Sequence, residues 1–349
     1  MFELNGNRFQ YEPSVIFHSD DNWQYGREPI LRRLPDGSLV SLIYAGGPSE
    51  PHDENVVLIT RSVDDGATWT KPEILFSHDA RGVWATEMFT EGPRPFIIFY
   101  TLDAASHYLD LHAFRSFYDS ATATWTEPSS MPSGLHSVNY RQGVVLADGS
   151  WLFPVYWEEV LTGFNWQKEG KGFKPHDGWQ FIAGAVRSED QGKTFSNHGY
   201  LKDERFLWEP NLVEVSPNHI VMLMRAEGTP WKYRSESLDG GRTWSPAVQS
   251  DIPCANSKIT LLKWGERTIL IHNPSDVPGW DHRTSLEIWV SDDGCKTWPI
   301  KRVLAKAVAP KQVLCYPHGF IDQASETLYV AIDGVTAFYL CKVPLADLS

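Results

Sequence analysis

The sequence predicts an all-β protein built as a six-bladed β-propeller. Three observations carry this prediction: an aromatic content of 15 Trp, 17 Phe and 13 Tyr beside 26 Gly and 23 Pro, a recurring eight-residue motif, and the absence of any long stripe at helical period. Aromatic side chains favour half-buried pleated surfaces, whereas Gly and Pro interrupt helices and central strands. This balance is typical of many short strands joined by turns.

The recurring motif has the form Ser-x-Asp-x-Gly-x-Thr-Trp. It begins at positions 62, 188, 237 and 291, with Phe195 in place of Trp in the second copy and Cys295 in place of Gly in the fourth. A degenerate copy spans 116–125, so that neighbouring copies start 49 to 72 residues apart, which is the spacing of propeller blades. Asp, Ser and Thr side chains can bond nearby amides and Gly accepts the angles of a tight turn, so each copy is predicted to be a hairpin turn.

Strands are predicted before and between these turns. Alternating segments at 56–61, 181–187 and 286–290 come directly before good copies, and further strands are expected at 39–44, 96–100, 220–224, 268–272 and 327–332. About six blades of roughly 55 to 60 residues fill the chain, within the range known for propellers. The Gly/Lys-rich stretch 158–177 lacks alternation and is expected to be a long loop at one end of the wheel. Residues 1–349 are predicted to form one domain.

Charge and composition exclude several classes of partner. The chain has 44 acidic and 31 basic side chains, for a formal net charge of −13. An acidic chain without a Lys/Arg-rich stretch repels phosphates, which argues against nucleic acid and an anionic membrane surface. The four cysteines have no metal-binding spacing, so no metal site is expected. The N-terminus lacks the basic and apolar regions of a signal peptide and no run approaches the ~20 apolar residues of a membrane span, which predicts a cytoplasmic protein unless a leader has been removed.

The repeated motif resembles the Asp box, or BNR repeat, of the sialidase (neuraminidase) superfamily, whose members are six-bladed β-propellers. In that superfamily the boxes lie on the outer rim, away from the ligand, so the resemblance assigns them to the scaffold. It also implies an exo-acting glycoside hydrolase that cleaves a terminal acidic sugar with retention of configuration and without a metal or organic cofactor.

Sialidases bind the sugar carboxylate with three arginines, and the resemblance implies three positions here. Tyr-Gly-Arg27-Glu-Pro resembles the opening Arg-Ile-Pro motif, with Glu28 in place of Ile. Arg225 follows Glu209 at the family's spacing, and Arg283 comes directly before the last box. Three guanidiniums suit one carboxylate because each is planar, always charged and able to bond it bidentately.

The family's reaction centre is a tyrosine nucleophile with a glutamate base, facing an acid/base aspartate. The resemblance assigns these roles to Tyr316, Glu209 and Asp53, and it assigns to Asp333 the orientation of Arg27 in place of the family's glutamate. A phenol beside a carboxylate can attack an anionic sugar without the repulsion that a second carboxylate nucleophile would meet.

The same residues are compatible with two other functions. Histidines at His52, His176 and His318 fall in loops or at strand ends, and His with Tyr also suits proton abstraction beside a uronate carboxylate. A hydrolase or lyase acting on another acidic glycan is therefore the alternative. A non-catalytic propeller that binds an acidic glycan is the third possibility. The sequence predicts no oligomeric state.

Overall fold

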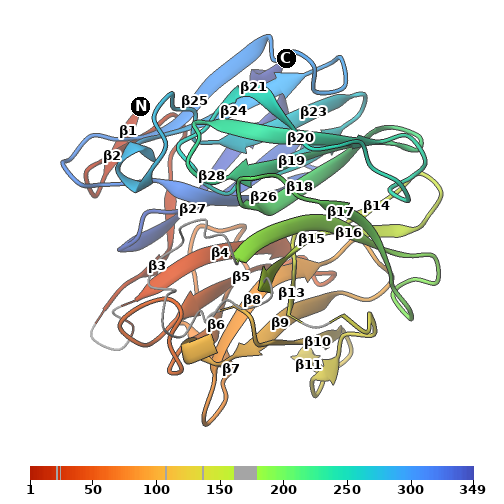
Figure 1. Ribbon diagram of the computed structural model, residues 1–349. Coiled ribbons are helices and arrows are strands. Elements are labelled where there is room, and N and C mark those ends of the chain that lie inside the picture. The colour runs from red at the N-terminus through yellow and green to blue at the C-terminus, as the bar shows by residue number, and fades with distance from the viewer. Residues whose placement is uncertain (21–22, 24, 107, 136, 161–178) are drawn as a thin grey trace.

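The computed structural model describes residues 1–20, 23, 25–106, 108–135, 137–160 and 179–349. Its strands form six separate sheets, and the described residues contain no α-helix, only three short 3₁₀ turns at Ala104–Ser106, Trp280–His282 and Leu345–Leu348. The six sheets follow one another in a ring (Figure 1). This confirms the all-β, six-bladed propeller that the sequence predicts.

The first three blades are consecutive antiparallel sheets, each counted from its innermost strand outwards. Blade 1 consists of β4 (Gly26–Arg33), β5 (Leu39–Ala45), β6 (Val56–Ser62) and β7 (Glu73–Phe76). Blade 2 consists of β8 (Gly82–Phe89), β9 (Phe96–Leu102) and β10 (Leu111–Asp119), with β11 (Thr124–Trp125) and β12 (Ser129–Ser130) at its edge. Blade 3 consists of β13 (Val138–Tyr140) and β14 (Val144–Val145), β15 (Trp151–Val160), β16 (Trp179–Ser188) and β17 (Ser196–Leu201). Most of the loop expected at 158–177 lies outside the described residues.

The remaining blades include the N-terminal strands. Blade 4 consists of β18 (Leu207–Ser216), β19 (His219–Ala226), β20 (Trp231–Ser237) and β21 (Val248–Pro253). Blade 5 consists of β22 (Thr260–Trp264), β23 (Arg267–His272), β24 (Ser285–Ser291) and β25 (Ile300–Ala307), extended by β2 (Asn7–Phe9) and β1 (Phe2–Leu4). Blade 6 consists of β26 (Cys315–Asp322), β27 (Thr327–Asp333), β28 (Ala337–Pro344) and β3 (Ser14–His18).

The ring is closed by strands from opposite ends of the chain. Strand β3 pairs with β28, so the first and last parts of the chain share blade 6 (Figure 1). The innermost strands also contact one another around the circle, including β26 with β4 and β22 with β26. Pairing with β3 covers the edge of β28 and joins the first part of the chain to the last blade.

The four complete Asp boxes form the same turn. In the first box Ser62 Oγ donates to Asp64 Oδ1 at 2.8 Å, and Gly66 N donates to Ser62 Oγ at 2.8 Å. Thr68 donates to Asp64 through its amide at 2.9 Å and through its hydroxyl at 2.5 Å. These Thr hydrogen bonds lower the pKa of Asp64 to about 2. In the fourth box Cys295 adopts φ 63°, the left-handed conformation that Gly has in the other three.

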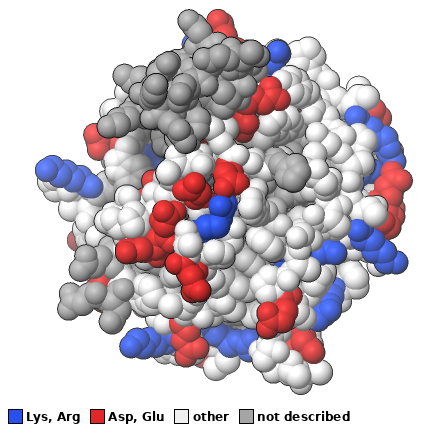
Figure 2. Space-filling model, turned by 60° about the horizontal axis from the view of Figure 1, so that its bottom comes forward, with Lys and Arg blue, Asp and Glu red and all other residues white. Residues whose placement is uncertain are grey.

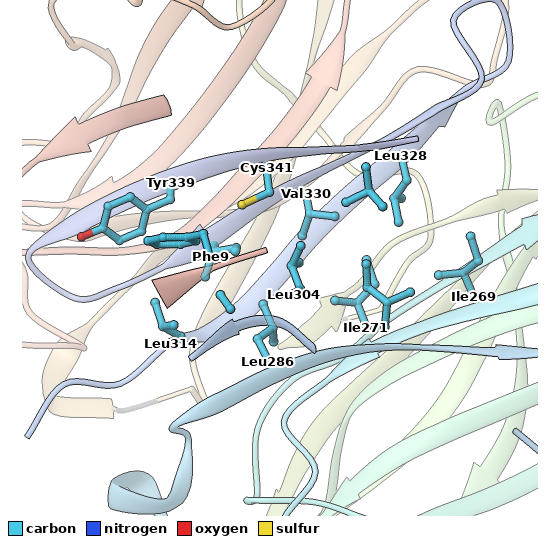
Figure 3. Packing of buried hydrophobic residues seen from close by; sticks show 14 of the residues in the cluster. Phe9, Ile269, Ile271, Leu286, Leu304, Leu314, Leu328, Val330, Tyr339 and Cys341 are labelled. Atoms are coloured by element: carbon cyan, nitrogen blue, oxygen red, sulfur yellow. The ribbon is translucent and has the colours of Figure 1, made fainter. Parts of the chain in front are cut away.

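The hydrophobic core is divided among the interfaces between blades. Between blades 5 and 6, the side chains of Phe9, Leu304 and Leu286 meet those of Val330 and Tyr339 (Figure 3). Phe9 comes from β2 and packs on Tyr339 with ring centroids 4.9 Å apart. The N-terminal hairpin therefore contributes to the core as well as to the sheet edge.

Candidate active site

A cavity of about 480 Å³ opens at the end of the ring where the innermost strands begin. Figure 2 shows one face of the molecule, on which acidic side chains surround a small group of basic ones near the centre. The cavity is lined by four arginines, four glutamates, seven aromatic residues and one valine: Arg27, Arg141, Arg225, Arg283, Glu28, Glu50, Glu209, Glu227, Tyr25, Trp84, Tyr108, Tyr156, Trp208, Trp280, Tyr316 and Val335.

Three innermost strands carry the same backbone irregularity at this cavity. Glu28 in β4, Glu209 in β18 and Tyr316 in β26 have φ values of 49°, 46° and 46°. Each is followed by a proline, and the strand register shifts at each position. A left-handed conformation costs a non-Gly residue roughly 1–2 kcal/mol, and such strain is typical of functional sites. The bulges give these three side chains equivalent positions in blades 1, 4 and 6.

The three arginines predicted from the sequence line this one cavity, but they differ in their partners. Arg27 Nε lies 3.0 Å from Asp333 Oδ2, and Arg225 Nη1 lies 3.1 Å from Glu209 Oε2. Arg283 forms no ion pair with a carboxylate of the described residues, and its Nε and Nη1 make no hydrogen bond to them. Its side chain is nevertheless buried. Arg283 is therefore the predicted arginine whose charge is least compensated by the protein.

Tryptophan rings hold these guanidiniums in place. The Cζ atoms of Arg27 and Arg283 lie 4.5 Å and 4.8 Å from the ring centroid of Trp280, and that of Arg225 lies 3.9 Å from Trp208. The face of an aromatic ring attracts a cation without cancelling its charge. The stacking fixes the arginines and leaves their charge available.

Tyr316 stands among cations. Its ring centroid lies 5.2 Å from the Cζ atoms of both Arg27 and Arg283 and 5.3 Å from Lys258 Nζ. Arg225 Nη1 donates to its hydroxyl at 3.4 Å. Positive charge on several sides of a phenol lowers the free energy of the phenolate and so opposes the effect of burial on the phenolic pKa.

Glu209 and Tyr316 share Arg225 as a neighbour, and their pKa values are shifted in opposite directions. Burial opposes the ionisation of Glu209, but the guanidiniums of Arg225, Arg141 and Arg283 outweigh it and lower its pKa to about 2. Burial and the Glu209 carboxylate raise the pKa of Tyr316 above 10.0, although Arg283 and Arg225 oppose this. Without ligand, the structure favours a glutamate carboxylate and a neutral phenol.

Asp53 does not line the cavity. Its carboxylate accepts a hydrogen bond from the Ala104 amide at 2.8 Å, and its side chain is exposed on the loop after β5. The backbone turns in this loop, so the side chain three residues earlier faces the cavity instead. The sequence alone could not choose among the acidic residues of this loop, because the choice depends on which one the turn points inwards.

The acidic side chain of this loop that lines the cavity is Glu50. Tyr25 Oη donates to Glu50 Oε2 at 2.8 Å and Tyr108 Oη donates to Oε1 at 3.3 Å. Burial, and then the nearby Glu28 carboxylate, raise the pKa of Glu50 above 4.5, against the effect of Arg27. Glu50 is thus a carboxyl group at the cavity whose pKa is shifted upwards, which is the direction that a general acid requires.

Of the three predicted histidines, the two that the structure describes, His52 and His318, do not line the cavity. His52 lies outside it, and its Nδ1 accepts a hydrogen bond from the Glu54 amide at 3.2 Å. His318 is buried beside β4, where its Nδ1 accepts a hydrogen bond from the Leu31 amide at 3.1 Å, and burial holds its pKa well below 6.5. His176 lies outside the described residues.

Sequence reasoning missed a second ionic group on the cavity wall. Arg141 Nη1 lies 3.1 Å from Glu28 Oε2, and its Nη2 lies 3.9 Å from Glu209 Oε1. Arg141 therefore bridges two of the bulge carboxylates. A usable signal was present, because Glu28, Glu209 and Tyr316 are each followed by proline in the innermost strand of a blade. Among the described residues no group of His, Cys, Asp and Glu could hold a metal ion, and no helix is long and apolar enough to cross a membrane.

The fold and the site together define a sialidase-like propeller with Asp boxes. The chain belongs to the family described as the BNR repeat-like domain, which matches residues 37–330. It is 22% identical over 337 residues to a sialidase of Bacteroides fragilis (strain YCH46), and the match covers 84% of this chain and 58% of that protein. The chain thus spans well under two thirds of the length of this relative.

Solved structures share the fold. Hadza microbial sialidase Hz136 has a TM-score of 0.72 at 17% identity, covering 96% of this chain and 68% of the other. A protein of unknown function from Dyadobacter fermentans DSM 18053 has a TM-score of 0.69 at 14% identity, covering 97% and 99%. The NanB sialidase of Streptococcus pneumoniae, as its K499G mutant, has a TM-score of 0.68 at 12% identity, covering 98% and 71%. At these identities the likeness shows the fold alone.

Proposed function

We propose that the protein is a retaining exo-glycosidase of the sialidase type that removes a terminal sugar bearing a carboxylate. The observation that supports this most is the position of Tyr316: its hydroxyl and the Glu209 carboxylate both contact Nη1 of Arg225, at 3.4 Å and 3.1 Å. A nucleophile and its base must lie within reach of each other and of the groups that stabilise developing charge.

The charges of the cavity suit a monoanionic sugar. Arg27 and Arg225 each have a carboxylate partner, whereas Arg283 has none within the described residues, and two of its guanidinium nitrogens, Nε and Nη1, make no hydrogen bond to those residues. Charge-assisted hydrogen bonds from a guanidinium to a carboxylate are among the strongest in proteins. We therefore assign to Arg283 the main contact with the sugar carboxylate, with Arg27 and Arg225 beside it.

In the first step Glu209 takes the phenolic proton of Tyr316 while the phenolic oxygen attacks the anomeric carbon. Glu50, rather than Asp53, gives its proton to the leaving oxygen as the bond to the rest of the glycan breaks. In the second step a water attacks the same carbon, Glu50 takes its proton, and the phenolic oxygen of Tyr316 leaves and recovers its proton from Glu209. The free sugar leaves with its anomeric configuration retained, and Tyr316, Glu209 and Glu50 return to their starting protonation states.

Substrate binding adjusts the base. The pKa of Glu209 is about 2 while Arg225, Arg141 and Arg283 act on it. A sugar carboxylate that binds Arg225 and Arg283 takes up part of this positive charge, so the pKa of Glu209 rises towards the range in which it accepts a proton. We call Arg27, Arg225 and Arg283 the carboxylate clamp. The clamp thereby couples binding of the acidic sugar to activation of Tyr316.

The test compares the wild type with Tyr316→Phe on an aryl α-sialoside and on an aryl uronide. The expected result is sialoside turnover and a glycosyl adduct trapped on Tyr316 in the wild type, both absent in the variant. Tyr11→Phe is the matched control, because Tyr11 does not line the cavity and its hydroxyl donates a hydrogen bond to Asp347 at 3.1 Å. If only the uronide reacts and a histidine is essential, the uronate enzyme is the right reading. If neither reacts but an acidic glycan binds, the protein is a glycan-binding propeller.

A further inference from the structure

One neutral residue contacts two of the three clamp arginines. Asn256 lies in the turn between β21 and β22, and its Oδ1 accepts a hydrogen bond from Arg225 Nε at 2.7 Å. Its backbone oxygen accepts one from Arg283 Nη2 at 2.5 Å. Arg225 comes from β19 in blade 4, whereas Arg283 precedes β24 in blade 5. Asn256 is therefore a direct link between guanidiniums from neighbouring blades.

The conformation of Asn256 makes both contacts possible. Its φ is 57°, and the residue is 5% exposed. Asn tolerates the left-handed region better than most residues do, and this conformation presents the side-chain oxygen and the backbone oxygen to different neighbours.

The turn is also held from behind. Lys232 in β20 is buried, and its Nζ donates to the Ser257 backbone oxygen at 2.5 Å. The Ser257 amide donates to Cys254 Sγ at 3.5 Å. These contacts fix the residue that follows Asn256, so the position of Asn256 is set by blade 4 rather than by ligand.

The chemistry of an amide suits this position. The amide oxygen accepts the Arg225 hydrogen bond as a carboxylate would, but it adds no negative charge beside the clamp. Arg225 already faces Glu209 at 3.1 Å and Glu227 at 3.6 Å. A third acidic neighbour would further reduce the positive charge available to a ligand carboxylate.

We propose that Asn256 is a positioning and specificity residue: it holds Arg225 and Arg283 at a fixed separation, and because it is neutral it preserves the charge with which they select a sugar carboxylate over an uncharged group. This inference rests on the proposed function, in which these arginines bind that carboxylate. It adds the residue that sets the clamp's geometry and charge.

The experiment measures, by titration calorimetry, the affinities of N-acetylneuraminic acid and of its methyl ester, and of glucuronic acid and its methyl ester. Asn256→Asp retains an oxygen for Arg225 but adds a charge. Asn256→Gly retains the left-handed backbone and the contact to Arg283 but loses Oδ1. Asn218→Gly is the matched control, because Asn218 is also left-handed, with φ 66°, and lies in the exposed turn between β18 and β19.

The wild type is expected to prefer the acid to the ester. Both Asn256 variants should lose roughly tenfold or more in affinity for the acid, the effect of one charge-assisted hydrogen bond or one nearby charge, with the ester unchanged within about twofold. Asn218→Gly should match the wild type. A general structural defect would instead weaken acid and ester alike, and that result would overturn the inference.

The outcomes separate the two proposals. If the wild type prefers neither acid over its ester, the carboxylate clamp is wrong and the inference falls with the proposed function. If the wild type does prefer an acid but both Asn256 variants keep that preference, the proposed function stands and the role given to Asn256 is wrong.

Discussion

Replacing Glu209 by Gln should destabilise the fold, because the ionised carboxylate interacts with buried guanidiniums that Gln cannot neutralise. The pKa of Glu209 falls from 4.5 to about 2 in the folded protein, against the effect of burial and under that of Arg225, Arg141 and Arg283. One pKa unit corresponds to about 1.4 kcal/mol, so the ionised form contributes about 3 kcal/mol to folding at neutral pH.

The pH dependence gives this prediction its sign. The pKa of Glu209 is lower in the folded protein than in the unfolded chain. Its contribution to the free energy of unfolding is therefore complete above pH 4.5 and is lost as the pH falls through about 2. The difference in unfolding free energy between the wild type and Glu209→Gln should therefore be about 3 kcal/mol at pH 7 and about half of that at pH 3.

Urea denaturation at several pH values, followed by tryptophan fluorescence and checked for reversibility, measures this difference. Glu127→Gln is the control, because Glu127 is exposed on the rim and should change the unfolding free energy by less than about 0.5 kcal/mol. The reasoning is refuted if Glu209→Gln stays within about 1 kcal/mol of the wild type at pH 7, or if its deficit does not shrink in acid.

Three further predictions follow from other parts of the structure. Glu50→Gln should lower kcat about 10²- to 10⁴-fold for a glycan leaving group, and much less for an aryl group that leaves unprotonated. The wild type should lose activity as pH rises through the raised pKa of Glu50, and the variant should not show this loss. If the two pH–rate profiles are the same, Glu50 is not the acid. Gly66→Ala should lower the unfolding free energy by about 2 kcal/mol in urea melts, since φ is +84° and the new Cβ would lie 2.2 Å from Leu340 Cδ2; a neutral effect would mean that the first Asp box can relax. Thr68→Val should raise the midpoint pH of acid unfolding, monitored by near-UV circular dichroism, by about a few tenths of a unit. Thr68 lowers the pKa of Asp64, and the stabilisation that results is present above pH 3.8 and is lost as the pH falls towards 2. An unchanged midpoint would show that this box does not limit acid stability.

The scaffold could be predicted from sequence because its signals are local. Each Asp box contains its own hydrogen-bonding partners within a few residues, as the Ser62, Asp64 and Thr68 contacts show. Strand alternation is equally local, and the predicted segments at 56–61 and 286–290 correspond to β6 and β24.

The cavity could be predicted only in part. The resemblance assigned Arg27, Arg225, Arg283 and Tyr316 to one pocket, and all four line the cavity, because a family resemblance carries long-range information that local sequence patterns lack. The sequence assigned the acid/base role to Asp53 and did not single out Glu50, because which side chain faces the cavity depends on the path of one loop. The contacts of Asn256 depend on a left-handed turn and on two arginines from different blades. Such features follow from three-dimensional packing, which neither periodicity nor composition encodes.

The shared sixth blade has a consequence for the order of folding. Strand β3 pairs with β28, and Asp333 beside β28 accepts a hydrogen bond from the Glu28 amide across 305 positions of sequence. During synthesis the first strands must wait, unpaired on one edge, until the last blade has been made. Blades 1 to 4 and strands β22 to β25 of blade 5 can form progressively from near neighbours, but the contacts of Arg27 with Asp333 and Tyr316 arise only when the ring closes. A ribosome-bound chain that lacks its final thirty or so residues would therefore contain most of the sheets and the Glu209–Arg225 ion pair within blade 4, but not the contacts of Arg27 with Asp333 and Tyr316. The slowest step of folding should then be loop closure over nearly the whole chain.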